Sequence, residues 1–155
     1  MMVISGGQTG ADRGGLDAAI ELGIPHGGWC PKGRRAEDGI IPAKYKLHEC
    51  EHESYKARTR LNVQDADITV VFCFGPPTGG SLFTLECVKP SGLSWAVFDL
   101  DVAKDSWIVR ELWAKMRGGS AKIVNVAGSR ESKAPGIQQR VCDIMRAVLA
   151  PWRTK

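Results

Sequence analysis

The residues best suited to chemistry lie in loops that contain several glycines. The first loop, residues 5–10, reads S-G-G-Q-T-G and connects a short apolar run to a helical pattern. Glycines let a backbone approach an anion, and free N–H groups at the start of a helix can bind it. The segment lacks both the G-x-G-x-x-G and the Walker patterns, so a plain tight turn is the alternative. We expect a phosphate-binding loop that includes Gly6, Gly7, Gln8, Thr9 and Gly10, with Arg13 in the helix that follows.

Two further loops have the same character. Residues 78–81, T-G-G-S, follow the most apolar run of the chain, and Ser81 and Thr84 could offer hydroxyls at the start of the next helix. Ser81 could instead simply cap that helix. Residues 128–136 add two cations and two hydroxyls, although a solvated surface loop would look similar. The residues expected to bind ligand in these two loops are Thr78, Gly79, Gly80, Ser81, Thr84, Ser129, Arg130, Ser132 and Lys133.

Basic residues follow the second predicted strand. Lys32, Arg34 and Arg35 stand where an NAD-binding domain would place an acidic residue for the ribose. Their charge disfavours NAD and favours a ligand with further anionic groups, although a merely solvated charge run is about as plausible. Arg58 and Asn62, one helical turn apart, are further candidates for the same crevice.

Alternating residues 48–52 raise the question of a metal. In a strand, His48, Cys50 and His52 would share one face in an arrangement that can bind a metal. No fourth ligand is in register with them, so we expect no structural metal.

Strand and helix patterns alternate along the chain. Strands are expected at residues 2–5, 24–29, 45–53, 68–74, 95–100 and 123–127. Helices are expected before Gly23, at 55–65, at 81–89, at 104–117 ending with Gly118 and Gly119, and at 137–149. This alternation predicts one Rossmann-like α/β domain over residues 1–155, a three-layer α/β/α sandwich with a mostly parallel sheet. Ligands of such folds bind at the carboxyl ends of the strands, where the three glycine loops begin, and we expect the first two loops to leave neighbouring strands.

Composition narrows the class of protein. The 155 residues are 43% hydrophobic and 25% charged, which is typical of globular domains. Residues 1–7 lack the basic and hydrophobic regions of a signal peptide, and no apolar run reaches roughly 18 residues. We therefore expect a cytoplasmic protein without membrane contact. The five cysteines are odd in number and form no C-x-x-C pair, so we expect free thiols. A net charge of +4 without a basic stripe interleaved with aromatics argues against nucleic acid, and five tryptophans predict a homo-oligomer.

Four motifs together resemble the molybdenum carrier family. They are S-G-G-Q-T-G-A-D-R at 5–13, P-H-G-G-W-C-P-K-G-R-R-A-E-D-G at 25–39, T-G-G-S at 78–81 and A-G-S-R-E-S-K-A-P-G-I at 127–137. The resemblance spans nearly the whole chain. That family belongs to the SLOG group of Rossmann-like proteins, together with the lysine decarboxylase-like (LOG) phosphoribohydrolases. The resemblance implies a binding or carrier protein for a phosphate-bearing ligand, either a molybdenum cofactor-type pterin or a nucleotide.

An enzyme is the alternative that the same resemblance suggests. The phosphoribohydrolases carry P-G-G-x-G-T-x-x-E, and Gly79, Gly80 and Glu86 keep that spacing here. Leu82 and Phe83 replace the glycine and threonine between them, which puts bulk where backbone would approach a ribose phosphate. If the protein is an enzyme, we expect a nucleotide N-glycosidic hydrolase with Glu86 or Asp12 as its acid-base group.

Overall fold

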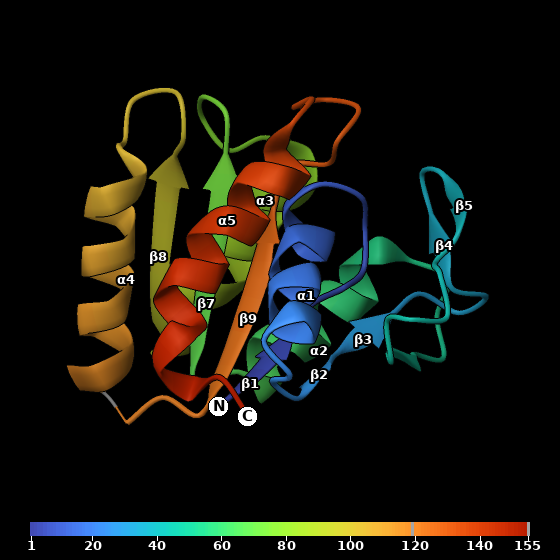
Figure 1. Cartoon of the computed structure of the whole chain (residues 1–155). Helices are drawn as coiled ribbons and strands as arrows, with labels where there is room; N and C mark the ends of the chain where they lie inside the picture. Colours follow the sequence, from blue (N-terminus) through green and yellow to red (C-terminus); the bar gives the residue numbers. More distant parts are fainter. Residues whose placement is uncertain (119, 155) are drawn as a thin grey trace.

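The fold is built on one parallel sheet. The computed structural model describes residues 1–118 and 120–154. Five strands, β1 (Met2–Ile4), β2 (His26–Gly27), β7 (Ile68–Cys73), β8 (Ser94–Asp99) and β9 (Ile123–Gly128), pair in parallel in the order β2-β1-β9-β7-β8 (Figure 1).

Helices cover both faces of this sheet. On one side lie α1 (Ala11–Glu21), α4 (Asp105–Gly118) and α5 (Ile137–Leu149), and on the other α2 (Tyr55–Asp65) and α3 (Gly79–Val88) (Figure 1). The fully buried strand β7 shows why two layers form, because its side chains alternate between them. Val70 and Phe72 join the core under α4 and α5, whereas Val71 and Cys73 pack with Val63 of α2 and residues of α3. The predicted three-layer α/β architecture is confirmed.

The region between β2 and α2 differs from the predicted strand at residues 45–53. Only β6 (His48–Glu49) is extended, and it pairs with β3 (Trp29–Cys30) outside the main sheet. The expected polar loop at 31–42 contains a hairpin of β4 (Arg35–Ala36) and β5 (Gly39–Ile40). This region has a small hydrophobic core of its own, to which the side chains of Tyr45 and Leu47 contribute. The two residues are separated by one position, as buried residues of a strand would be, although their segment is largely irregular.

Several helix boundaries refine the predictions. Helix α3 begins at Gly79 with Thr78 as its N-cap residue, so the prediction that Ser81 caps it is wrong. Helix α4 ends at Gly118, the first of the two predicted stop glycines, and Gly119 lies outside the described residues. Short 3₁₀ turns, η1 (Lys89–Ser91) and η2 (Ala150–Trp152), follow α3 and α5. No helix in the described part of the chain is long and apolar enough to cross a membrane.

The three glycine loops leave the carboxyl ends of β1, β9 and β7. Strand β9 lies between the other two, so the expectation that the loops after β1 and β7 leave neighbouring strands is wrong. A hydrogen bond instead joins the loops after β1 and β9, since Glu131 N donates to Thr9 Oγ1 at 3.2 Å. Ser129, which follows β9, also accepts from Ala11 N at the start of α1 at 3.1 Å and donates through its N–H to Phe72 O of β7 at 2.9 Å.

Candidate functional site

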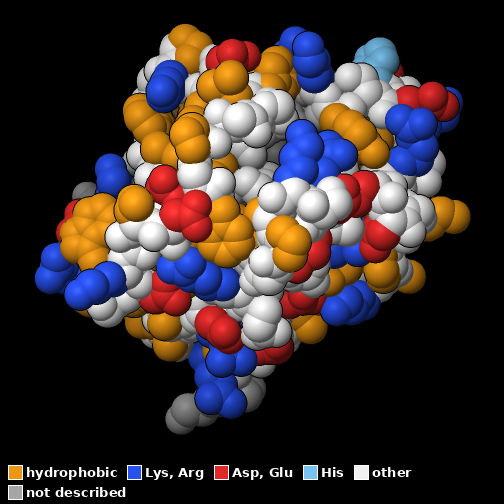
Figure 2. All heavy atoms as spheres, turned by 90° about the horizontal axis from the view of Figure 1, so that it is seen from above, with side chains coloured by type: hydrophobic (Ala, Val, Ile, Leu, Met, Phe, Trp, Pro, Cys, Tyr) orange, Lys and Arg blue, Asp and Glu red, His pale blue; other side chains and the backbone are white. Residues whose placement is uncertain are grey.

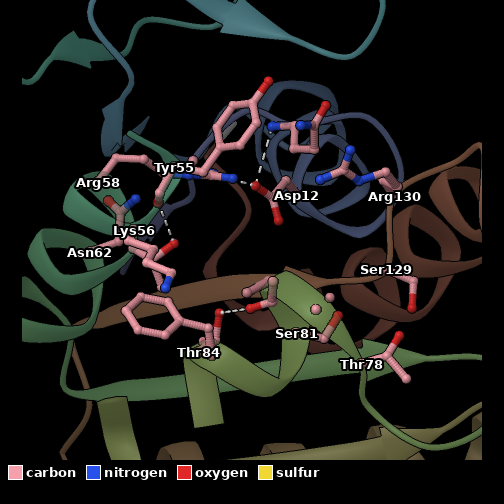
Figure 3. A pocket seen from close by; sticks show the side chains of 18 of the residues that line it. Asp12, Tyr55, Lys56, Arg58, Asn62, Thr78, Ser81, Thr84, Ser129 and Arg130 are labelled. Atoms are coloured by element: carbon pink, nitrogen blue, oxygen red, sulfur yellow. Dashed lines mark hydrogen bonds and ion pairs between the residues drawn. The ribbon is translucent and has the colours of Figure 1, made fainter. Parts of the chain in front are cut away.

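A cavity of about 430 Å³ opens at this end of the sheet, on the side of α2 and α3 (Figures 2 and 3). Its wall combines all three glycine loops with the first turns of α2 and α3 and the end of β9. The predicted site residues that line it are Gly6, Gln8, Asp12, Arg58, Asn62, Thr78, Gly79, Gly80, Ser81, Thr84, Ser129, Arg130 and Lys133. Elements far apart in the sequence thus meet at one pocket of ligand size.

The first turn of α3 forms one end of the cavity. Thr78 makes no side-chain cap, and neither Gly79 N nor Gly80 N has a hydrogen-bond partner among residues 1–118 and 120–154. Lys133 approaches this turn, with its Nζ 3.7 Å from where a Cβ on Gly79 would lie. Lys133 forms no ion pair with any residue that the structure describes. The unpaired N–H groups and this cation make the end attractive to an anion.

The floor of the cavity holds a buried ion pair. Arg58 Nη1 donates to Asp12 Oδ2 at 2.8 Å, and the two side chains are only 12% and 7% exposed (Figure 3). Gln8 N also donates to this carboxylate, at 3.2 Å. Asp12 therefore compensates the charge of Arg58 and fixes its position.

Gln8 lies beside this pair and anchors the first loop. Its Oε1 accepts hydrogen bonds from Thr9 N at 3.1 Å and from Glu37 N at 2.9 Å. Within the described residues, Gln8 Nε2 and Arg58 Nε are buried without a hydrogen-bond partner. Such groups are uncommon in folded proteins, and both atoms are enclosed by protein rather than open to the cavity.

Aromatic rings bound the side of the cavity near α2. The guanidinium carbons of Arg58 and Arg130 lie 5.6 and 5.9 Å from the centre of the Tyr55 ring. Lys56 approaches Phe83, with its Nζ 5.3 Å from the centre of that ring. The residues expected to bind ligand did not include these lining residues: Ser54, Tyr55, Lys56, Thr59, Phe74, Pro76, Phe83, Asn125, Ala127 and Gly128. Helical spacing from Arg58 and Asn62 would have found Tyr55 and Thr59, since positions three or four apart share a helix face.

The turn of the β4–β5 hairpin clamps the first and third loops together. Glu37 accepts hydrogen bonds from Ser132 Oγ at 2.5 Å, from Ser132 N at 3.2 Å, and from the Thr9 hydroxyl. Burial would raise the pKa of Glu37, but the hydrogen bonds from Ser132 and Thr9 outweigh it and hold that pKa below its ordinary value. Glu37 was not among the residues expected at the site, although the Asp38-Gly39 pair next to it is a hairpin signal.

The neighbouring Asp38 fixes Arg13. Arg13 Nη1 and Nη2 donate to its two carboxylate oxygens at 2.6 and 2.8 Å, and these bonds lower the pKa of Asp38. Arg13 Nε also donates to Gly7 O at 3.0 Å. Arg13 thus supports the first loop from behind rather than lining the cavity.

Other predicted site residues also lie outside the cavity wall. They are Gly7, Thr9, Gly10, Lys32, Arg34, Arg35, Ser132 and Glu86. Lys32, Arg35 and Glu86 are exposed, whereas the Arg34 guanidinium donates to backbone carbonyls, including Tyr45 O at 2.9 Å. The structure therefore does not bring the basic triplet to the cavity.

Asn62 lines the cavity but is engaged elsewhere. Its Oδ1 accepts from Trp29 N at 2.8 Å, and its Nδ2 donates to Trp29 O at 2.9 Å.

All five cysteines are free thiols. His48, Cys50 and His52 do not assemble into a metal site, since the described residues contain no cluster of three His, Cys, Asp or Glu side chains that could hold an ion.

A parallel α/β sheet with a pocket enclosed by loops at the carboxyl ends of its strands defines a Rossmann-like protein. The model of the circularly permutated YpsA SLOG family matches residues 3–149, and the chain belongs to that family. The crystal structure of a putative molybdenum carrier protein from Syntrophus aciditrophicus SB is similar throughout, with a TM-score of 0.93 and 38% sequence identity. The similarity covers 96% of this chain and 94% of that one. No curated protein matches this chain.

Proposed function

We propose that this protein is a non-catalytic binding or carrier protein that holds a small phosphate-bearing molecule in the cavity. The main support is the first turn of α3, where the N–H groups of Gly79 and Gly80 are unpaired within the described chain and Lys133 lies close by. A phosphate at this turn would accept hydrogen bonds from those N–H groups and interact favourably with the helix dipole.

The charges of the cavity wall support an anionic ligand. Four cations line it, Lys56, Arg58, Arg130 and Lys133, and Asp12 is the single acidic residue in the described wall. Asp12 compensates Arg58, and Arg130 lies 3.8 Å from Glu37, so Lys56 and Lys133 keep the least compensated charge. Such an excess of positive charge raises the local concentration of anions.

The chemistry of the wall also fits the organic part of a molybdenum cofactor-type pterin or a nucleotide. Hydroxyls, amides and the rings of Tyr55 and Phe83 can contact a phosphate and a planar ring. No cysteine or histidine occurs in the described wall, so protein side chains that favour a soft metal are missing from it. The name of the similar protein from Syntrophus aciditrophicus SB makes a molybdenum-containing ligand a reasonable first candidate.

An N-glycosidic hydrolase is the alternative, and the geometry favours it less. Glu86 is exposed and lies outside the cavity wall, while Asp12 is committed to Arg58. We expect no release of free base when the protein is incubated with nucleoside monophosphates. Base release that is lost in Glu86→Gln or Asp12→Asn would instead favour the hydrolase.

Two glycine variants test the carrier function. Gly80 lines the cavity, has ordinary backbone angles and has open space where an added Cβ would lie, so Gly80→Val should fold and obstruct the ligand. Gly7 has φ +78°, and an added Cβ would meet the Leu47 and Ile41 side chains, so Gly7→Val should impair folding. Mass spectrometry of small molecules that co-purify should find a phosphorus-bearing compound with the parent and not with Gly80→Val. The same compound retained by a folded Gly80→Val would refute the proposal.

We also propose that the chain forms a homo-oligomer through the β8 edge of the sheet. Trp107 and Val97, at 44% and 37% exposed, line an apolar groove along this edge. Within the described chain β8 pairs only with β7, and an open edge next to apolar side chains favours association. Light scattering that shows a monomer at high concentration would exclude this.

Residues 1–155 are proposed to be one cytoplasmic domain. The main core joins residues from Val3 to Leu149, which supports a single cooperative unit, and free thiols suit a reducing compartment. Unfolding in two separate transitions would contradict the single domain, and recovery of the native protein outside the cytoplasm would contradict the location.

A further inference from the structure

The loop after β9 sends two cations to different parts of the cavity. Arg130 and Lys133 both line the cavity wall. Lys133 approaches the first turn of α3, where its Nζ lies 3.7 Å from the position that a Cβ on Gly79 would take. Arg130 approaches α2 instead, with its guanidinium carbon 5.9 Å from the centre of the Tyr55 ring. Figure 3 shows Arg130 and Tyr55 across the cavity from Ser81 in the first turn of α3.

The Arg130 guanidinium has neighbours but no hydrogen-bond acceptor. Its acidic neighbour, Glu37, lies 3.8 Å away, which is too far for a hydrogen bond. Glu37 compensates part of the charge of Arg130, but it accepts its hydrogen bonds from Ser132 and Thr9. The Tyr55 ring supports the guanidinium through a cation–π contact. No hydrogen bond within residues 1–118 and 120–154 involves this guanidinium, so its N–H donors are unused.

These unused donors are open to a ligand. The Arg130 side chain is 33% exposed and belongs to the cavity wall, so a molecule in the cavity can reach it. Arg58, by contrast, is 12% exposed and donates to Asp12 at 2.8 Å. Arginine presents its N–H groups as a planar fork that fits a phosphate or a carboxylate. Arg130 therefore offers a second position for an anion.

A single phosphate group does not account for both ends of the cavity. The unpaired N–H groups of Gly79 and Gly80, together with the Lys133 ammonium, already supply donors for one phosphate at the α3 end. A phosphate there would leave Arg130 without an acceptor, because Arg130 lies across the cavity (Figure 3). The cavity volume of about 430 Å³ leaves room for a ligand that extends between the two ends.

We propose that Arg130 forms a second anion subsite, so that the ligand carries two separate anionic groups, one at the first turn of α3 and one at Arg130. This rests on the proposed function and narrows its ligand class. A compound whose only anionic group is one phosphate would use the α3 end alone. The cavity instead suits a molecule that is acidic at two ends, in which the second group is a phosphate or another oxyanion that fits the arginine fork.

Inorganic phosphate tests the two subsites separately, because it can occupy each one without spanning the cavity. NMR titration of the isotope-labelled parent follows the Gly80 amide and the Arg130 Nε–H group. We expect both signals to shift and to saturate. Arg110, which is 73% exposed on the other face of the sheet, provides the matched control, and its Nε–H signal should not saturate. An Arg130 signal that behaves like that of Arg110 would overturn the inference.

Two variants show whether the subsites are separate. Arg130→Gln loses no hydrogen bond within the described chain, so it should fold, and phosphate should still bind at Gly80 with nearly the parent affinity. Lys133→Ala should weaken binding at Gly80 about tenfold or more and leave the Arg130 response nearly unchanged. If Arg130→Gln weakens binding at Gly80 as much as Lys133→Ala does, the two cations share one phosphate and the inference is wrong.

The same titration separates this inference from the proposed function. If phosphate shifts the Gly80 amide and leaves Arg130 unaffected, the second subsite is wrong and the phosphate site at α3 stands. If the Gly80 amide does not respond, the proposed function fails, and a ligand with two anionic groups fails with it.

Discussion

Replacing Asp12 by asparagine tests the buried ion pair on which the cavity floor depends. The substitution preserves the shape of the side chain and removes its charge, which leaves the Arg58 guanidinium uncompensated while 12% exposed. Breaking a buried pair by removing one partner typically costs about 3–5 kcal/mol. An asparagine oxygen can still accept one hydrogen bond, so we expect a loss of about 3 kcal/mol in the free energy of unfolding.

Urea denaturation measures this loss directly, and the m-value should not change. For a domain of this size, such a loss also corresponds to a fall of roughly 6–12 °C in Tm. The matched control is Glu21→Gln, which breaks the Glu21–Arg146 pair at 3.0 Å. Those side chains are 49% and 47% exposed, so the control should cost at most about 1 kcal/mol.

Equal stabilities of Asp12→Asn and Glu21→Gln would refute the structural role of Asp12. Parent-like stability of Asp12→Asn together with a lost hydrolytic activity would make Asp12 an acid-base group instead.

Three further substitutions, with Lys32→Ala as a control, test the side chains that support the loops. Because the pKa of Glu37 is lowered in the folded state, the stability it contributes is present above its ordinary value of about 4.3 and is lost as the pH falls through the lowered value. Glu37→Gln should therefore flatten the stability profile in that acidic range, and an unchanged profile would exclude the clamp. Arg34→Ala should lower stability by about 2 kcal/mol, because it leaves backbone carbonyls without their donor, whereas Lys32→Ala should have little effect on thermal melting. Asn62→Ala removes both hydrogen bonds to the backbone of Trp29 and should cost about 2–3 kcal/mol in chemical denaturation, and a neutral result would show that Asn62 does not stabilise the fold.

The layers of this fold could be predicted because its central elements carry strong periodic signals. In β7 an unbroken apolar run is buried on both faces, and in α5 apolar residues recur on one helical face. Weak local signals misled the prediction between residues 25 and 53. Two-residue strands there depend on pairing across the chain, as Trp29 pairs with His48, and no local pattern specifies such contacts.

The site was predictable where glycine loops end buried strands, and less so where side chains act on distant loops. Gln8, Ser81 and Lys133 come to the cavity because parallel strands place their loops at one edge. Glu37 contacts Ser132, 95 positions away, and only the folded chain brings them together. Arg34 and Arg13 looked equally suited to phosphate, but their guanidinium groups are used by carbonyls and by Asp38.

Isothermal titration of inorganic pyrophosphate into the parent, Lys133→Ala and Lys122→Ala tests the central claim most directly. Lys133 approaches the first turn of α3, whereas Lys122 is exposed just before β9, at the opposite end of the sheet. Hydrogen bonds to charged groups contribute about 1.5–3 kcal/mol, so Lys133→Ala should weaken binding by roughly 10- to 150-fold, while Lys122→Ala should match the parent. Pyrophosphate binding that both variants retain equally, or that the parent lacks, would contradict a phosphate site at this turn.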